Sequence, residues 1–260
     1  MIVSWFSAGC SSAVATKIAL EMTEKGQDEM VIVYEHIDDQ HPDTMRFVRE
    51  CEEWFGQEIE IIQSKYKTVD NACRSFGFLK SAYGAKCTDV LKMRERKRWE
   101  RENPGRHMYV WGFDANEKHR AERRETSMED SDHWFPLIDD NITKEIVHDI
   151  IERAGIKRPA MYELGYPNNN CVGCLKGGAG YWNKIRVDFP DVFESRAKLE
   201  RAIGHSCLKK QVDGKTELIY LDELPPEMGR NQKMIVPECG MFCTQETAYL
   251  TDNPLNKESK

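Results

Sequence analysis

The sequence lacks any apolar run that approaches the ~18 residues needed to span a membrane as a helix. Its first residues also lack the basic stretch of a secretory signal peptide, and their apolar run ends at residues 7–9. We therefore expect a cytoplasmic protein without a membrane partner. Neither sign of charge dominates, since 37 basic residues stand against 44 acidic ones and give a net charge of −7. The overall charge therefore does not favour binding of a polyanion, although two local basic clusters could contact nucleic acid.

The composition argues for a folded soluble protein and against disorder, because 40% of the residues are hydrophobic and 31% are charged. A chain of 260 residues is long enough to bury a full core. We predict a nucleotide-binding domain over residues 1–165 and a cysteine-containing module over residues 166–260.

Two common phosphate-binding signatures are missing as well, namely the G-x-x-x-x-G-K-[ST] loop and the G-x-G-x-x-G turn. The chain nevertheless opens with an apolar run over 2–6, a turn of small and hydroxyl residues over 7–12, and an apolar-rich stretch over 13–20. This order predicts a buried strand, a tight turn and a helix whose first N–H groups suit a phosphate. The predicted ligand groups belong to Ser7, Gly9, Ser11 and Ser12.

The helix alone cannot hold such a ligand. Its dipole is worth roughly 0.3–1 kcal/mol to an anion, whereas micromolar binding requires about 8 kcal/mol. Other residues must therefore contribute, and the alternative is an ordinary turn in which a serine caps the helix and a glycine makes the bend.

Further strands are predicted over residues 30–36, 58–62 and 108–113, with helical patterns between them. Pro42 suits the first turn of the helix that follows the second strand. The alternation predicts an α/β fold with a doubly wound parallel sheet, which binds ligands at the carboxyl ends of its strands.

Two charged helices are expected. Thr88 is predicted to cap the first, which has a basic face over residues 94–101. On the second, Arg120, Arg123 and Arg124 share one face, and guanidinium groups match phosphate or sulfate oxygens. The alternative for each helix is a solvated surface balanced by neighbouring glutamates.

Nine cysteines in a chain of this kind favour metal ligands, nucleophiles or core residues over disulfides. Cys171-x-x-Cys174 can place two thiolates on one turn, and Cys239 and Cys243 would complete a four-thiolate site for zinc or an iron–sulfur cluster of the 4Fe–4S type. Four free buried thiols are the alternative. We expect Cys207 to be structural.

Residues 6–13 resemble the PP-loop, S-G-G-x-[DS]-S, of ATP pyrophosphatases and phosphoadenylyl-sulfate (PAPS) reductases, with Ala8 in place of the first glycine and Ser11 where the pyrophosphatases usually have aspartate. Residues 41–48, 87–92, 112–120, 134–147 and 162–174 are similar, in the same order, to further PAPS reductase segments. The resemblance implies the adenine nucleotide α-hydrolase-like fold and an enzyme that binds ATP or a PAPS-type nucleotide, with Mg²⁺.

The resemblance also implies roles for individual residues. Asp38 occupies the position of a nucleotide-contacting D-T-G triplet, which implies a ribose or magnesium contact, with a solvated loop that includes Asp39 as the alternative. Site roles are implied for a further set: Cys87, Lys92, Gly112, Glu117 and Arg120.

The tail admits two readings, because residues 238–240 read Glu-Cys-Gly. This triplet resembles the segment that carries the nucleophile of sulfonucleotide reductases, which would make Cys239 catalytic and thioredoxin a partner. In the second reading Cys239 is a metal ligand, as in PP-loop enzymes that thiolate nucleic acids.

Three functions follow from these readings. The first is substrate adenylation or sulfur transfer, with nucleic acid as an acceptor. The second is a thioredoxin-dependent reductase, and the third is a nucleotide- or metal-binding module without catalysis.

Overall fold

The structure, a computed structural model, describes residues 1–23, 29–81, 84–129, 131–212, 215–230 and 234. It divides into two compact units, and each is considered by itself. Unit 1 comprises Met1–His36, His41–Ile62 and Trp99–Asn169, and unit 2 comprises Ile37–Gln40, Gln63–Arg98 and the chain from Asn170 onward. The domain boundary near residue 165 stays a prediction, because these units group residues by compactness rather than by order along the chain.

Unit 1 contains a five-stranded parallel sheet with the strand order β3-β2-β1-β6-β7. Its strands are β1 (Ile2–Phe6), β2 (Met30–His36), β3 (Ile59–Gln63), β6 (Met108–Val110) and β7 (Asp132–Trp134). In the parallel register, Ile2 of β1 lies opposite Met30 on one side and Met108 on the other. The order reverses at β1, so the carboxyl ends of β1 and β6 form the switch point of the sheet. The predicted doubly wound α/β fold is confirmed.

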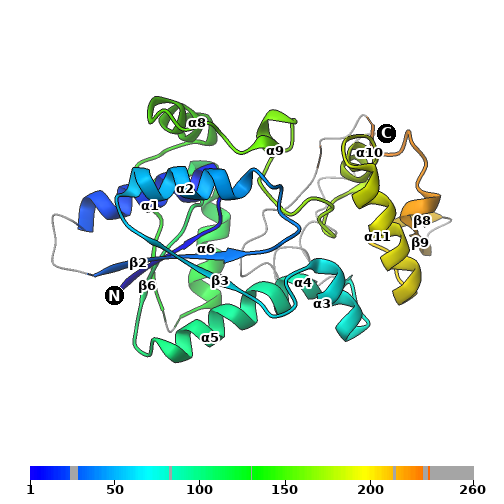
Figure 1. Cartoon of the computed structure of the whole chain (residues 1–260), viewed down its shortest axis with the longest axis horizontal. Helices are drawn as coiled ribbons and strands as arrows, with labels where there is room; N and C mark the ends of the chain where they lie inside the picture. The colour runs from blue at the N-terminus through cyan, green and yellow to red at the C-terminus, as the bar shows by residue number, and fades with distance from the viewer. Residues whose placement is uncertain (24–28, 82–83, 130, 213–214, 231–233, 235–260) are drawn as a thin grey trace. The chain divides into compact units, whose positions relative to one another are not determined.

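Helices cover both faces of this sheet, because its central strand is apolar on both sides. Phe6 faces α2 (Thr44–Phe55), with its ring centroid 5.7 Å from that of Phe55. Trp5 points to the opposite face and meets Trp99 of α5 (Arg94–Glu102) at 5.4 Å. Figure 1 shows α1 (Cys10–Thr23) and α2 on one side of the strands and α5 on the other.

The remaining helices of unit 1 are shorter. They are η2 (Ala115–Glu117), α6 (Lys118–Ser127), α7 (Pro136–Asp139), α8 (Lys144–Arg153) and α9 (Ala160–Glu163). Helix α1 packs against α2, α7 and α8, which places the first helix at the centre of its layer.

Unit 2 is mainly helical. Its elements are α3 (Val69–Phe76), β4 (Lys80–Ser81), β5 (Gly84–Ala85), α4 (Lys86–Thr88), the π-helix η1 (Asp89–Met93), α10 (Ala179–Asp188), α11 (Pro190–Ile203), β8 (Leu208–Val212), β9 (Lys215–Ile219) and η3 (Leu221–Glu223). Strands β4 and β5 form one antiparallel pair, and β8 and β9 form another. The core of unit 2 includes Tyr181, Trp182 and Leu175, all fully buried.

Two local predictions are corrected. Thr88 does not cap a helix, because the helical run begins two residues earlier at Lys86 with Ala85 in the N-cap position. The strand expected over residues 108–113 ends at Val110, since the chain leaves the sheet before Gly112.

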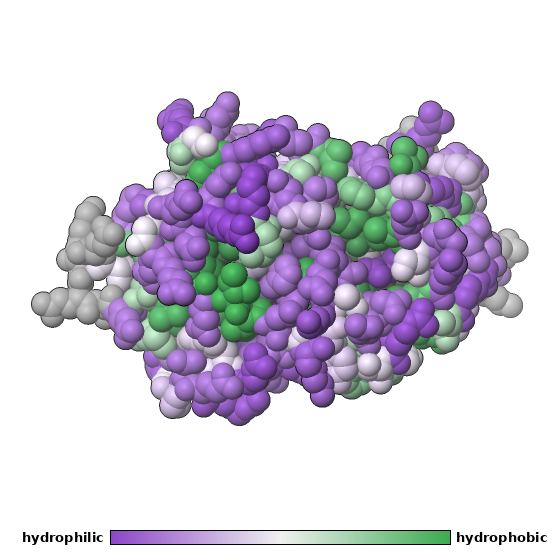
Figure 2. All heavy atoms as spheres, in the orientation of Figure 1, coloured by the Kyte–Doolittle hydropathy of each residue, from purple (hydrophilic) through white to green (hydrophobic). Residues whose placement is uncertain are grey.

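The surface is mostly hydrophilic on the face shown in Figure 2, and hydrophobic side chains gather over the strand β3. β3 is the edge strand of the sheet, and Ile61 on it is half exposed. Within the described ranges, no helix combines the length and the apolar character that crossing a bilayer requires.

Candidate functional site

Residues 7–12, which we call the loop, comprise the turn after β1 and the first three residues of α1, and hydrogen bonds to one hydroxyl group close this segment. The backbone N–H and the hydroxyl of Ser7 both donate to Ser12 Oγ, at 3.2 and 2.9 Å. Ser12 Oγ in turn donates to the carbonyl of Gly9 at 2.9 Å, and Ala13 N–H donates to the same carbonyl at 3.0 Å. The loop therefore leads directly into α1, whose first N–H groups lack intrahelical partners.

Ala8 has a left-handed backbone with φ +57°. An L-residue pays roughly 1–2 kcal/mol in this region, and glycine pays far less. The position where the S-G-G pattern has its first glycine therefore has, in this chain, a backbone conformation that favours glycine. Its side chain is fully buried, and its carbonyl accepts a hydrogen bond from Asn169 Nδ2 at 2.8 Å.

Gly112 lies against the first turn of α1. A Cβ atom added at Gly112 would stand 2.6 Å from Ser12 Cα and 2.7 Å from Ser12 N, closer than atoms can approach without a shift. The loop after β6 and the loop after β1 therefore meet at the switch point of the sheet, and only glycine fits there. This gives a tertiary reason for the predicted site residue Gly112.

Cationic and hydroxyl groups surround the start of α1. Burial raises the pKa of the Cys10 thiol to about 12, although the positive charges of Arg158 and Lys144 and a hydrogen bond with Tyr162 lower it. Cys10 is consequently a protonated core thiol rather than a nucleophile. A Cβ on Gly9 would lie 3.5 Å from the Tyr162 hydroxyl, so this hydroxyl sits beside the loop.

Three residues near the start of α1, namely Lys144, Tyr162 and Asn168, were not among the predicted site residues. Lys144 Nζ donates to the Pro167 carbonyl at 2.9 Å and to Asn168 Oδ1 at 2.8 Å. Tyr162 and Asn168 lie in the segment that resembles the family, and this resemblance is the signal that could have identified them. Lys144 lies in the resembling segment 134–147, but the position itself was not singled out, and its place near Cys10 depends on how α8 packs against α1.

The arginines of α6, which were predicted to share one face, differ in their exposure to solvent. Arg120 is buried, pairs with Glu117 and stacks 4.3 Å above the ring of Phe113. Arg124 is also buried and lies 4.8 Å above the ring of Trp111. Each guanidinium group therefore has one face against an aromatic ring of the segment that follows β6.

Arg123 and Glu117, the two other predicted site residues of this segment, make hydrogen bonds with nearby residues. Arg123 is half exposed, and its Nε donates to the carbonyl of His119 at 3.1 Å. Glu117 belongs to a capping box, in which Asp114 N–H donates to its carboxylate at 3.0 Å and the Asp114 side chain accepts from Asn116 N–H at 2.8 Å. This box fixes the start of the helix that presents Arg120.

In unit 2, the turn that carries Cys171 and Cys174 is fixed by hydrogen bonds with Tyr181 and by close packing against Val192. Tyr181 Oη accepts from Cys174 N–H at 2.8 Å and donates to the Cys171 carbonyl at 3.3 Å. The turn passes through Gly173 at φ +72°, where a Cβ would lie 2.7 Å from a methyl group of Val192. Both cysteines are buried.

Asp39 is not part of a solvated loop. It pairs with the buried Arg196 of α11, and its carboxylate accepts from Val69 N–H at 2.6 Å. Arg196 Nε also donates to the Gly173 carbonyl at 3.3 Å, while Val172 N–H donates to the Asp39 carbonyl at 2.8 Å. The segment after β2 and the cysteine turn are therefore tied together within unit 2.

Three other predicted residues lie in unit 2. The carboxylate of Asp38 accepts from Gln63 Nε2 at 2.7 Å in an exposed position. Cys87 is half buried on α4, and Lys92 is buried in the π-helix η1. Short π-helical turns occur often at functional sites, which fits the expected role of Lys92.

The other buried cysteines are ordinary core thiols. Burial raises the pKa of Cys73 to about 12 and that of Cys207 well above its usual value. Cys207 is thus structural, as expected. Cys239 and Cys243 lie outside the described residues, and among the residues that are described no three His, Cys, Asp or Glu side chains are placed to hold a metal ion. The described part contributes two thiols, Cys171 and Cys174, to the predicted four-thiolate site.

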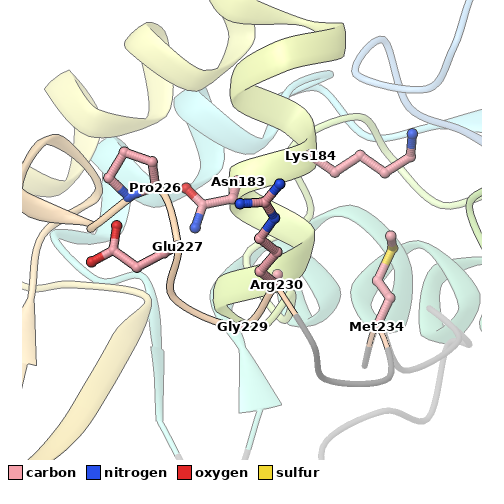
Figure 3. Close-up of a pocket in the computed structure, with 8 residues that line it drawn as sticks. Asn183, Lys184, Pro226, Glu227, Gly229, Arg230 and Met234 are labelled. Carbon is pink, nitrogen blue, oxygen red and sulfur yellow. The ribbon is translucent and has the colours of Figure 1, made fainter.

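A groove of about 470 Å³ lies beside α10 in unit 2. Figure 3 shows Asn183 and Lys184 on this helix, with Glu227, Arg230 and Met234 from the following chain around the groove. Asn183 Nδ2 donates to the carbonyls of Pro225 and Met228, both at 2.9 Å, and fixes that chain to the helix. These hydrogen bonds hold residues 225–228 against α10 on one side of the groove, in the part of the sequence that precedes Cys239.

The predicted site residues fall into two groups. Unit 1 contains Ser7, Gly9, Ser11, Ser12, Gly112, Glu117, Arg120, Arg123 and Arg124, and unit 2 contains Asp38, Cys87, Lys92, Cys171 and Cys174. Within unit 1, the structure brings Gly112 against the loop of residues 7–12.

The family profile described as the phosphoadenosine phosphosulfate reductase domain matches residues 1–177, which include the loop, the α6 segment and both cysteines of the turn. No curated protein matches the chain.

Proposed function

Because the chain belongs to the phosphoadenosine phosphosulfate reductase domain family, we propose that residues 7–12 bind the phosphates of ATP or of a PAPS-type nucleotide. The observation that carries the proposal is the position of this loop. It follows the central strand β1 at the point where the strand order reverses, and Gly112 closes it from the neighbouring strand end. Open α/β sheets bind ligands at this point.

The residues around the loop have suitable chemistry for phosphates. The N–H groups of the first turn of α1 point toward the N-terminal end of the helix, and this turn contains the hydroxyl residues Ser11 and Ser12. Lys144 and Arg120 are the cations that we assign to the remaining phosphate charge, because the helix dipole supplies too little affinity. Mg²⁺ would arrive with the nucleotide and take most of its ligands from phosphate oxygens and water.

We assign substrate adenylation as the reaction, with sulfur transfer to an acceptor as its purpose. An acceptor oxygen would attack the α-phosphorus of ATP, the bond to the β-phosphate oxygen would break, and pyrophosphate would leave. The chain's own contribution is to hold the phosphates in line with the acceptor and to neutralise the charge that develops on the leaving group.

The competing function is a reductase. The Cys239 thiolate would attack the sulfur of PAPS, the sulfur–oxygen bond to the phosphate would break, and the adenine nucleotide would leave. A thioredoxin dithiol would then reduce the cysteine S-sulfonate and release sulfite. The Glu-Cys-Gly sequence of residues 238–240 favours this candidate.

Gly9→Val is expected to weaken ATP or PAPS binding at least about tenfold, because its branched side chain would occupy phosphate space. The fold should persist, since an added Cβ at Gly9 makes only ordinary contacts of 3.5 Å. Isothermal calorimetry measures the affinity and thermal melting checks the fold. Gly9→Ala serves as the control with a smaller side chain and should lose less affinity. Unchanged binding in Gly9→Val would reject the loop as the phosphate site.

Product analysis separates the candidate reactions. Pyrophosphate released from ATP in the presence of an acceptor supports adenylation, and sulfite released from PAPS with thioredoxin supports the reductase. A protein that binds nucleotide and forms neither product would be a binding module.

We further propose that Cys171, Cys174, Cys239 and Cys243 hold zinc or a 4Fe–4S cluster. The described half of the site fits, because Tyr181 and Gly173 fix two thiols on one turn. Such a group would supply structural closure of the C-terminal module, and its ligands would be thiolates.

Serine substitution of each of the four cysteines is expected to reduce the metal-to-protein ratio by more than half in protein purified without oxygen. Cys51→Ala, which removes a buried thiol from unit 1, is the control and should retain full metal. Full metal retention in Cys239→Ser and Cys243→Ser, with loss of sulfite production only in Cys239→Ser, would instead make Cys239 the nucleophile.

A further inference from the structure

Exposed aromatic rings flank the end of α3 in unit 2. Phe76 is the last residue of the helix and Phe78 follows it after Gly77, and the two side chains are 38% and 37% exposed. Gly77 has φ +58° and ends the helix with a left-handed turn. The ring of Tyr66 lies 5.7 Å from that of Phe76. Three aromatic rings therefore share one exposed region.

Cations lie over these rings. Lys86 Nζ is 5.3 Å from the centroid of Phe76 and 5.8 Å from that of Phe78, and the guanidinium of Arg94 is 4.7 Å from Phe76. Asp89 holds both cations in place, since its Oδ2 is 3.1 Å from Lys86 Nζ and 3.0 Å from Arg94 Nη2. The cations are thus ordered without being buried.

The surrounding chain is strongly basic. Residues 63–94 contain seven Lys and Arg against two Asp, a net charge of +5 in a chain whose total is −7. Lys65, Lys67 and Arg74 are exposed, and Lys65 lies 5.2 Å from the ring of Tyr66. Helices α3 and α4, which carry Arg74, Phe76 and Lys86, pack against each other (Figure 1). We call it the aromatic–basic surface, and it consists of Lys65, Tyr66, Lys67, Arg74, Phe76, Phe78, Lys86 and Arg94.

We propose that the aromatic–basic surface binds single-stranded nucleic acid. Exposed rings offer stacking platforms for unpaired bases, and the cations between them suit the phosphates that connect those bases. A duplex would use the cations but not the rings, because its bases are already stacked. The surface lies within unit 2, and its binding does not depend on a nucleotide at residues 7–12.

Fluorescence anisotropy with labelled oligonucleotides of about 12 nucleotides, a length within the usual site size, tests the proposal without ATP. RNA and DNA single strands are the two arms, and a DNA duplex of the same length is the comparison. We expect the full chain to bind at least one single strand more tightly than the duplex. Phe76→Ala/Phe78→Ala should weaken that binding at least about tenfold. Leu218→Ala, which removes a side chain of equal exposure from β9, should leave it unchanged.

Salt dependence tests the cations separately. Lys65→Gln/Arg74→Gln should lower the slope of log affinity against log salt concentration by about one unit. Lys198→Gln, an exposed cation of α11, is the matched control. Equal binding of duplex and single strand, or an equal loss in Leu218→Ala and in the phenylalanine variant, would overturn the proposal. So would the absence of single-strand binding at low salt, which would leave a protein partner as the use of these rings.

Discussion

Gly112→Ala is expected to destabilise the protein by about 3 kcal/mol and to remove measurable nucleotide binding. The added methyl would stand 2.6 Å from Ser12 Cα, and a backbone atom cannot move aside as a flexible side chain can. Overpacking costs roughly 1–3 kcal/mol, and the upper end applies because α1 must shift against the sheet. Urea denaturation measures the stability, and calorimetry with ATP and PAPS measures the binding.

The control for Gly112→Ala is Gly9→Ala in the same site. An added Cβ at Gly9 would have contacts no shorter than 3.5 Å, so its stability should change little. If both variants unfolded at the same urea concentration, the close approach of the two loops would be wrong.

Arg196→Met is expected to destabilise the protein by about 3–5 kcal/mol, the usual cost of leaving one charge of a buried pair behind. The methionine keeps the apolar stem of the side chain but leaves Asp39 with the Val69 amide and without its cation. The Gly173 carbonyl loses its donor as well, so the cysteine turn should loosen. Urea denaturation measures the loss, and faster alkylation of Cys171 and Cys174 would report the looser turn.

Arg201→Met is the matched control on the same helix. Arg201 pairs with Asp222 and Glu223 on the surface, and its loss should hardly move the unfolding midpoint. Asp39→Asn combined with Arg196→Met should recover part of the stability, because no charge is then left unpaired. A loss in Arg196→Met no larger than that in Arg201→Met would contradict the buried pair.

Local patterns were sufficient for much of the fold. The strand predicted over residues 30–36 coincides with β2, and the strand predicted over residues 2–6 coincides with β1. The first helix was also predicted, but it begins at Cys10, inside the turn expected over residues 7–12. β7 was missed, because Asp132-His133-Trp134 has no alternation of its own and is a strand through its pairing with β6. The prediction that Thr88 caps the helix was also wrong, because the helical run already begins at Lys86 and continues through Thr88 into the π-helix η1.

The candidate site was less predictable, because its key contacts join distant residues. Asp39 and Arg196 are separated by 157 positions, and no spacing rule connects them. The resemblance pointed to Gly112, but its reason is an approach to Ser12 that only the folded chain reveals. The burial of Arg120 and Arg124 on aromatic rings also depends on tertiary packing, which helical spacing alone does not contain.

The division into two units has a consequence for synthesis on the ribosome. The chain passes from one unit to the other after residues 36, 40, 62, 98 and 169, so neither unit is a continuous stretch. All residues of unit 1 have been synthesised once residue 169 has emerged. The segments 37–40 and 63–98 belong to unit 2, so they cannot pack fully until α10 and α11 have also been synthesised. A fragment that ends at residue 165 would contain Asp39 but lack Arg196, the cation that pairs with it. We therefore expect such a fragment to need a chaperone or to aggregate, and the halves to function only when translated as one chain.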